Sequence, residues 1–121
     1  MTPNLIPYFS DLFKHPESIE VSSTGEANRI HDTKMGKYTK VDGLKYNNNH
    51  VWKHSSGSHF VFHTGNKWAI GPDFTDINGG SIRSIGGSNP SIEGHTWEHM
   101  GDDSNWHQDQ TLTVKSFYDG N

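Results

Sequence analysis

HVWKHSSGSHFVFHTGNKWAIG, residues 50–71, alternates apolar or aromatic side chains with polar ones and is interrupted twice by glycine-containing segments. Alternation with a period of two is typical of half-buried β-strands. The interruptions, SSGS and TGN, have the composition of hairpin turns. The stretch therefore predicts three consecutive antiparallel strands, with turns centred on Ser56-Gly57 and Gly65-Asn66.

These two turns fix which side chains face each other. The first sets His54 opposite His59 and His50 opposite His63, and the second sets His63 opposite Trp68. Since successive side chains alternate between the faces of a sheet, four apolar residues should share the core side: Trp52, Val61, Trp68 and Ile70. The opposite face should carry Val51, Lys53, Phe60 and Phe62. A shift of one residue would exchange the two faces.

Similar short runs flank this stretch and are separated by turn residues. They are a strand around Ile19 and Val21, then KYTKV (37–41), SIRSI (81–85), HTWEH (95–99) and TLTVKSF (111–117). The expected turns are DG (42–43), NGG (78–80), GGSNP (86–90) and GDDS (101–104), and residues 23–36 form a polar connection with Ile30 buried. Strands at this spacing predict a mainly β fold, a single antiparallel meander forming a small barrel or sandwich.

The first residues follow a different period. Apolar side chains recur at spacings of three and four in residues 3–14: Leu5, Ile6, Tyr8, Phe9, Leu12 and Phe13. This pattern predicts a short amphipathic helix that begins near Pro7 and ends before Pro16. We expect residues 1–16 to be a helical segment that packs on the sheet, and residues 17–121 to be the antiparallel β domain.

Composition excludes several classes of protein. The chain has 121 residues, a net charge of −4 and no cysteine. Its acidic balance, with no run of Lys or Arg, argues against nucleic-acid binding. Without cysteine there is no disulfide, thiol nucleophile or thiolate metal site. No segment reaches the length of a membrane span, and the first residues lack the apolar core of a signal peptide.

The histidines raise the question of a metal site. His54 and His59, facing each other across a turn, could share a Zn or Cu ion, although no third ligand lies nearby in sequence. His95, Glu98 and His99 lack the HExxH order of zinc hydrolases. Asp73, Asp76 and Asn78 loosely match a calcium loop without its closing Glu, so a polar turn is the better interpretation. Metal binding is thus an alternative function and implies Zn or Cu as cofactor; otherwise no cofactor is expected.

Catalytic motifs are absent from the sequence. There is no GxSxG, P-loop or GxGxxG pattern. His107 and Asp109 would share one face of a strand, but this pairing is unspecific. Asp102 and Asp103 lie in the GDDS turn, where solvation or bonding to the local backbone accounts for them. A hydrolase is the third hypothesis, after two non-enzymatic ones.

The aromatic residues suggest the favoured function. Aromatic rings beside planar polar groups bind sugars, because the rings stack on apolar sugar faces while polar groups bond the hydroxyls. The richest such mixture surrounds the GDDS turn. We therefore expect a lectin-like carbohydrate site, or a site for another small polar ligand, formed by Trp97, His99, Asp102, Asp103, Asn105 and Trp106.

Part of the chain also resembles a known module. The matching residues are Val51-Trp52-Lys53, Phe60 and Phe62, Lys67-Trp68, Ile70-Gly71-Pro72, and finally Trp97 and Trp106. They are similar to a small β module of large predicted surface or secreted proteins in aquatic invertebrates and protists. The likeness covers roughly residues 35–115 and departs at Asn48-Asn49-His50, where the module has Asn-Gly-Arg-Pro. It implies a β fold and an extracellular binding role, and no activity.

Overall fold

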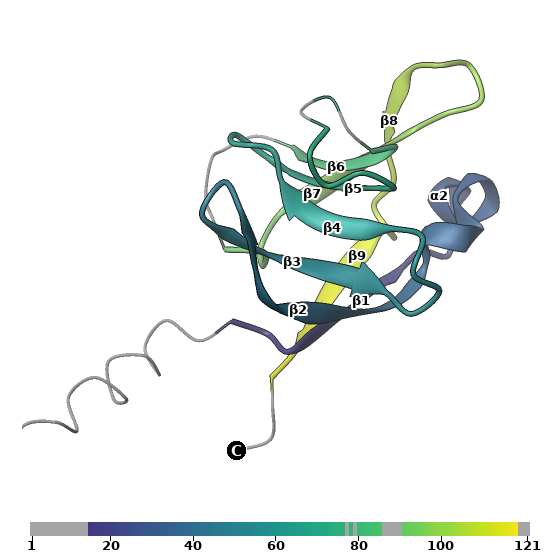
Figure 1. Ribbon diagram of the computed structural model, residues 1–121. Helices are drawn as coiled ribbons and strands as arrows, with labels where there is room; N and C mark the ends of the chain where they lie inside the picture. Colours follow the sequence, from purple (N-terminus) through teal and green to yellow (C-terminus); the bar gives the residue numbers. More distant parts are fainter. Residues whose placement is uncertain (1–14, 77, 79, 86–90, 119–121) are drawn as a thin grey trace, which may run out of the picture.

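The computed structural model describes residues 15–76, 78, 80–85 and 91–118. In this part of the chain, nine strands form one antiparallel sheet (Figure 1). They are β1 (Ser18–Ser22), β2 (Gly36–Tyr46), β3 (Asn49–His54), β4 (Phe60–His63), β5 (Trp68–Gly71), β6 (Ile82–Ile85), β7 (Thr96–Met100), β8 (Trp106–Gln108) and β9 (Thr113–Phe117). The prediction of a mainly β, antiparallel fold is confirmed.

The strand order explains the curvature of the sheet. Strands β1 to β8 pair in sequence, and β9 returns to pair with β1, so β8 and β9 are the two edges. A flat sheet of this width would separate its edges by about 38 Å. The connection between them, residues 109–112, can span only about 17 Å. The sheet therefore curls into a half-barrel, a single sheet rather than two sheets packed as a sandwich.

The register predicted for residues 50–71 is confirmed. Trp52 pairs with Val61, Val61 with Ile70, and His63 with Trp68. The His54 N–H donates to the carbonyl of His59 at 2.8 Å, so these two residues also face each other. Gly57 and Gly65 adopt φ values of 84° and 116°, which only glycine reaches without strain.

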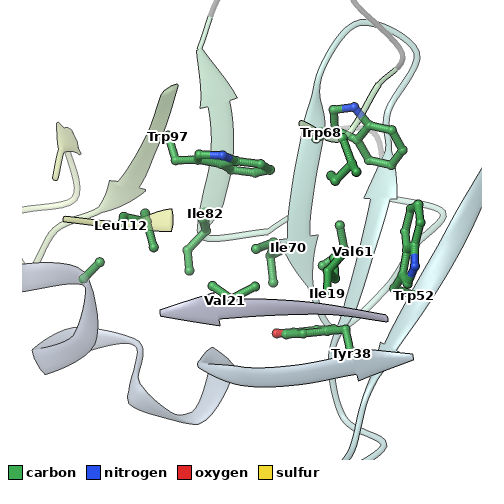
Figure 2. Packing of buried hydrophobic residues seen from close by; sticks show 12 residues of the cluster. Ile19, Val21, Tyr38, Trp52, Val61, Trp68, Ile70, Ile82, Trp97 and Leu112 are labelled. Carbon is green, nitrogen blue, oxygen red and sulfur yellow. The ribbon is translucent and has the colours of Figure 1, made fainter. Parts of the chain in front are cut away.

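The inner face of the half-barrel holds the main core (Figure 2). Its largest side chains are aromatic, and Trp52 and Trp68 meet edge to face with ring centroids 5.7 Å apart. The Trp52 indole N–H donates to the Pro16 carbonyl at 2.9 Å, so its polar atom is satisfied inside the core. The rest of the cluster includes Ile19, Val21, Tyr38, Val61, Ile70, Ile82, Ile92, Trp97 and Leu112.

A second, smaller cluster covers part of the opposite face. Val51, Phe62 and Ala69 are buried there beneath Leu44, Tyr46, Phe60 and Phe74. Phe60 and Phe62 thus lie on the face that their register predicted. Phe62 is nevertheless fully buried on this face, because Phe60 and Phe74 pack edge to face over the cluster.

The turn predicted at Asp42-Gly43 is misplaced. Asp42-Gly43 lies inside β2, at a shift in the β2–β3 register between Lys40 and Lys45. The chain reverses instead at Asn47-Asn48, whose φ values of 51° and 65° match a type I′ turn. Asparagine tolerates this left-handed conformation better than most residues, so the asparagine run was the stronger turn signal.

The polar connection between β1 and β2 contains short helices. α2 (Glu26–Ile30) is followed by the 3-10 helix η1 (Asp32–Lys34). Ala27 enters the main core from α2, whereas Ile30 is only half-buried. Strand β8 was also missed in the sequence. The predicted helix of residues 3–14 and the turn at 86–90 lie outside the described residues.

Within the described part of the chain, no helix is long and apolar enough to cross a membrane.

Candidate functional site

A groove of about 700 Å³ opens on the face of the sheet that points away from the main core. We call it the outer groove. It is lined by the β4–β5 turn, by outward-facing side chains of β5 to β8, and by the loop before β6: Thr64, Gly65, Asn66, Lys67, Ala69, Asn78, Gly80, Arg83, Met100 and Trp106.

Strand pairing sets the wall of this groove. Met100 pairs with Trp106, Arg83 pairs with Glu98, and Ala69 pairs with Arg83, so these side chains share one face. The Arg83 guanidinium lies 3.7 Å from the centroid of the Trp106 ring and so covers one face of the indole. Glu98 accepts a hydrogen bond from Arg83 Nε at 2.5 Å and holds the guanidinium in place. The half-buried indole is therefore fixed in position.

The opposite wall is polar. It comes from the β4–β5 turn, where Thr64 Oγ1 donates to Asn66 Oδ1 at 3.2 Å and to the Lys67 carbonyl at 3.2 Å. These bonds hold the turn and leave the Asn66 amide nitrogen and the Lys67 ammonium as donors toward solvent. Asn78 adds a second amide. A fixed aromatic ring thus faces planar polar groups across a shallow groove.

The predicted site residues divide among three places. Trp106 lines the outer groove, whereas Trp97 is 3 % exposed and belongs to the main core. The expectation that both tryptophans stand in one site is therefore wrong, because they lie on opposite faces of the sheet. Asp102, Asp103 and Asn105 lie in the exposed β7–β8 turn. Sequence reasoning missed Arg83, Asn66 and Lys67, although the alternation of β6 places Arg83 on the outer face.

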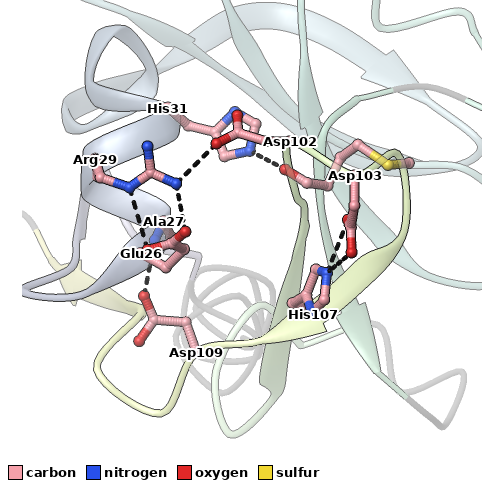
Figure 3. A network of polar contacts seen from close by, with 9 residues as sticks. Glu26, Ala27, Arg29, His31, Asp102, Asp103, His107 and Asp109 are labelled. Atoms are coloured by element: carbon pink, nitrogen blue, oxygen red, sulfur yellow. Dashed lines mark hydrogen bonds and ion pairs between the residues drawn. The ribbon is translucent and has the colours of Figure 1, made fainter.

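His99 lies on the inner face of β7, at the end of the half-barrel that α2 covers. It borders a cleft of about 420 Å³ lined by Glu26, His99, Gly101, Asp102, Asp103, His107 and Gln108. We call this the histidine cleft. Figure 3 shows the polar network around it, in which α2 faces the β7–β8 turn and the connection that follows β8.

Charged pairs surround the histidine cleft. Arg29 bonds Glu26 and lies 2.8 Å from Asp102, linking α2 to the β7–β8 turn. His107 Nε2 lies 2.9 Å from both carboxylate oxygens of Asp103. The bonds from His107 and from the Asn105 backbone lower the pKa of Asp103 to about 2. Burial lowers the pKa of His31, against the opposing effect of its bond to the Met100 carbonyl.

The pair considered for Zn or Cu, His54 and His59, does lie together, with ring centroids 6.1 Å apart. Both ring nitrogens of His54 are already engaged. Nδ1 is 2.8 Å from Ser56 Oγ and Nε2 is 2.7 Å from the Met35 carbonyl. A metal bound there would have to displace one of these bonds, so the geometry gives this pair little capacity to hold an ion.

Other candidate ligands are used locally. Asp73 Oδ1 accepts bonds from the backbone N–H and hydroxyl of Thr75, as in an Asx turn. His95 Nε2 lies 2.6 Å from the Ser91 carbonyl. Across the described ranges, no three ligating side chains are already gathered for a metal ion.

No protein-family model, curated protein or solved structure matches this chain. The resemblance to a surface-protein module therefore stays a prediction.

The remaining histidines should make the stability of the fold sensitive to acid. His50 lies between His15, at 4.3 Å between ring centroids, and Trp52, at 6.3 Å. Burial, then the charges of His15, Lys40 and Lys45, lower the pKa of His50 from 6.5 to about 4. Burial also lowers the pKa of His59 and His63. Burial is therefore a larger cause of these lowered pKa values than repulsion between neighbouring imidazoles.

The folded state keeps His50 neutral, whereas His50 in the unfolded chain takes up a proton near pH 6.5. The contribution of His50 to the free energy of unfolding is therefore complete above that pH. It is lost as pH falls from about 6.5 toward 4. After allowance for solvent screening at this half-buried site, we expect His50 to account for about 1 kcal/mol between pH 7 and 5. Urea denaturation at each pH measures this loss. His50→Gln should make the profile flatter, and an identical profile for that variant would contradict the assignment.

Proposed function

We propose that this protein is a non-enzymatic carbohydrate-binding module whose ligand site is the outer groove. The observation that carries the proposal is the Trp106 indole, fixed by Arg83 on the wall of a groove that also presents the donors of Asn66 and Lys67. A sugar ring would stack on the part of the indole that Arg83 leaves uncovered. Its hydroxyls would bond the amide and ammonium groups opposite.

The shape of the groove supports weak binding of a small ligand. It is shallow and mainly polar, and no apolar cavity encloses the ligand on all sides. Most of the binding free energy would therefore come from one stacking contact and a few hydrogen bonds that compete with water. We expect a millimolar Kd for a single sugar, about −4 kcal/mol.

The residues predicted from sequence for this function are thereby revised. Trp106 is kept, while Asn66, Lys67 and Arg83 replace Trp97 and the acidic turn as its neighbours. His99, Asp102 and Asp103 border the histidine cleft rather than the outer groove. The hydrolase hypothesis is not carried further, since the outer groove offers no carboxylate pair or activated nucleophile among its described residues.

Trp106→Ala is expected to abolish binding while leaving the melting temperature nearly unchanged, because the side chain lies outside the main core. A glycan array with neutral and acidic sugars would identify the ligand, and a titration followed by NMR would give the affinity of each variant. Trp106→Phe should keep part of the affinity, since it preserves a ring. Phe117→Ala is the matched control, because Phe117 is an exposed aromatic residue (42 %) outside the groove.

Two outcomes would contradict the proposal. The first is that the array and millimolar titrations show no sugar binding. The second is that a sugar binds Trp106→Ala as well as the unaltered chain, which would place the site elsewhere.

A further inference from the structure

We propose that the histidine cleft binds a divalent transition-metal ion, with zinc as the test ion, through the imidazoles of His31, His99 and His107. His99 and His107 face each other on the neighbouring strands β7 and β8, and the fold brings the distant His31 to them from the end of α2. The ring centroid of His99 lies 5.4 Å from that of His31 and 6.2 Å from that of His107.

His99 carries the proposal. Its side chain is 0 % exposed, and neither ring nitrogen has a hydrogen-bond partner in the protein. A buried polar atom without a partner costs about 1–3 kcal/mol, and nearly all such atoms in proteins are satisfied. Its two strand partners, the apolar Ile82 on β6 and His107 on β8, satisfy neither nitrogen. A cation in the cleft that accepts the lone pair of one ring nitrogen would remove the part of this cost that belongs to that nitrogen.

The two flanking histidines have the outer contacts typical of metal ligands. His31 Nε2 lies 2.7 Å from the Met100 carbonyl, and His107 Nε2 lies 2.9 Å from the Asp103 carboxylate. In metal sites, the second ring nitrogen of a ligating histidine usually donates to a carbonyl or carboxylate. This contact fixes the tautomer. With Nε2 protonated, Nδ1 of each ring keeps the free lone pair that a metal needs.

The spacing of the rings fits a shared ion. A Zn–N bond of about 2.1 Å in tetrahedral geometry separates the centres of two ligating imidazoles by roughly 5–6 Å. The two measured separations, 5.4 and 6.2 Å, are close to this range. No three ligating groups of the described residues converge on one point as they stand. The His31 and His107 side chains would therefore shift toward His99 on binding while keeping these outer contacts, and the His107 side chain, 49 % exposed, has room to do so together with the exposed Asp103.

The charge of the cleft favours a cation. Glu26, Asp102 and Asp103 line its rim, and the one arginine among them, Arg29, bonds both Glu26 and Asp102. One of these carboxylates or a water molecule would complete a four-coordinate site. The pair His54 and His59 offers no such set, because both nitrogens of His54 are engaged.

Calorimetry tests the proposal on the full chain, freed of any affinity tag and stripped of metal with a chelator. We expect one Zn²⁺ per chain with micromolar affinity, and a rise in melting temperature because the ion binds the folded state. Mg²⁺ should not bind, since it prefers oxygen ligands. Co²⁺ should give the visible absorption bands of a nitrogen-ligated tetrahedral site.

Variants distinguish this site from its rivals. His107→Gln is expected to weaken zinc binding at least tenfold without changing the melting temperature of the metal-free chain, because the side chain is half-exposed. Asp103→Asn, which removes the outer contact of His107, should weaken it about tenfold. His99→Gln should also lose the site, but because this residue is buried, the His107 variant decides. His54→Gln and His59→Gln are the matched controls and should bind zinc normally.

The proposal is overturned if the unaltered chain shows no saturable zinc binding up to about 1 mM, well above the micromolar range expected. It is also overturned if His107→Gln binds as tightly as the unaltered chain, or if His59→Gln abolishes binding instead. None of these results bears on the outer groove, which lies on the opposite face of the sheet.

Discussion

Trp97→Ala is expected to lower the free energy of unfolding by about 3–5 kcal/mol, the range for removing a large aromatic side chain from a core. The Trp97 side chain is 3 % exposed and packs in the main core with Ile82 and Leu112 (Figure 2). Alanine would leave a cavity that strands β6 and β7 cannot close, because their backbones are held by the ladder between them. Denaturation by urea, followed by circular dichroism, measures the loss.

Trp106→Ala is the matched control for this prediction. Trp106 lies on the neighbouring strand, but on the outer face, where the Arg83 guanidinium stacks on it. Its removal should cost no more than about 1 kcal/mol. Equal losses for the two variants, or a larger loss for Trp106→Ala, would mean that the faces of β7 and β8 are wrongly assigned. The site proposed in the outer groove would then fail with them.

The central hairpins were predictable because their signals are local. In residues 50–71, the alternation of side chains and the position of each turn together leave one register that buries both tryptophans. Gly57 and Gly65 adopt the positive φ that the turns require. A register error would have placed Trp52 and Ile70 in solvent, a cost of several kcal/mol. Local pattern and burial therefore agree in this part of the chain.

The errors arose where local signals compete. Asp42-Gly43 is a strong turn pair, yet it forms an irregularity inside β2, because the type I′ turn at Asn47-Asn48 reverses the chain. Helix α2 has only five residues and no apolar stripe. Its position depends on Ala27 entering the core and on bonds to residues about 80 positions later, which no local pattern contains.

The candidate sites were predictable only in part, because they too depend on contacts between residues that are distant in sequence. Trp106 was predicted as a surface aromatic residue, and it lies half-buried on the outer face. His99 was predicted for the same site but borders the histidine cleft. Their neighbours could not be found from sequence proximity. Arg83 reaches Trp106 across β7, and His31 reaches His99 from the connection between β1 and β2. Tryptophans close in sequence, such as Trp97 and Trp106, are separated by the sheet itself.

The two proposed sites also differ in what the fold contributes. The outer groove is built on strands β5 to β8, which neighbouring strands hold in place. The histidine cleft depends on how α2 and the β8–β9 connection close the end of the half-barrel. Any change that loosens this closure would disturb zinc binding before it affects the outer groove. One residue, Asp109, bonds both α2 and the β8–β9 connection and so holds these two segments together.

Asp109 lies in the connection between the two edge strands. Its Oδ2 accepts bonds from the Ser23 hydroxyl at 2.8 Å and from the Ala27 backbone N–H at 3.0 Å. Its Oδ1 accepts from the backbone N–H of Thr111 at 2.8 Å and from its hydroxyl at 2.7 Å. Burial raises the pKa of this carboxyl, but the bonds from Thr111, Ala27 and Ser23 outweigh burial and hold it at about 2.

Asp109→Ala is expected to lower the free energy of unfolding by about 3 kcal/mol at pH 7, because hydrogen bonds to a charged group contribute about 1.5–3 kcal/mol each and water replaces only part of them. Asp73→Ala is the matched control. Asp73 Oδ1 makes the same pair of bonds to Thr75, at 3.0 and 2.7 Å, but only within its own turn. Its loss should cost no more than about 1 kcal/mol.

The pH dependence of stability distinguishes the effect of the Asp109 charge from the effect of the side chain's size and shape. Since the folded pKa of Asp109 is lowered, its contribution is complete above the unfolded value of 3.8 and is lost as pH falls toward 2. The difference in stability between the unaltered chain and Asp109→Ala should therefore shrink between pH 5 and pH 2.5 in urea titrations. A difference that stays constant over this range, or a loss equal to that of Asp73→Ala, would show that the carboxylate does not hold α2 to the β8–β9 connection.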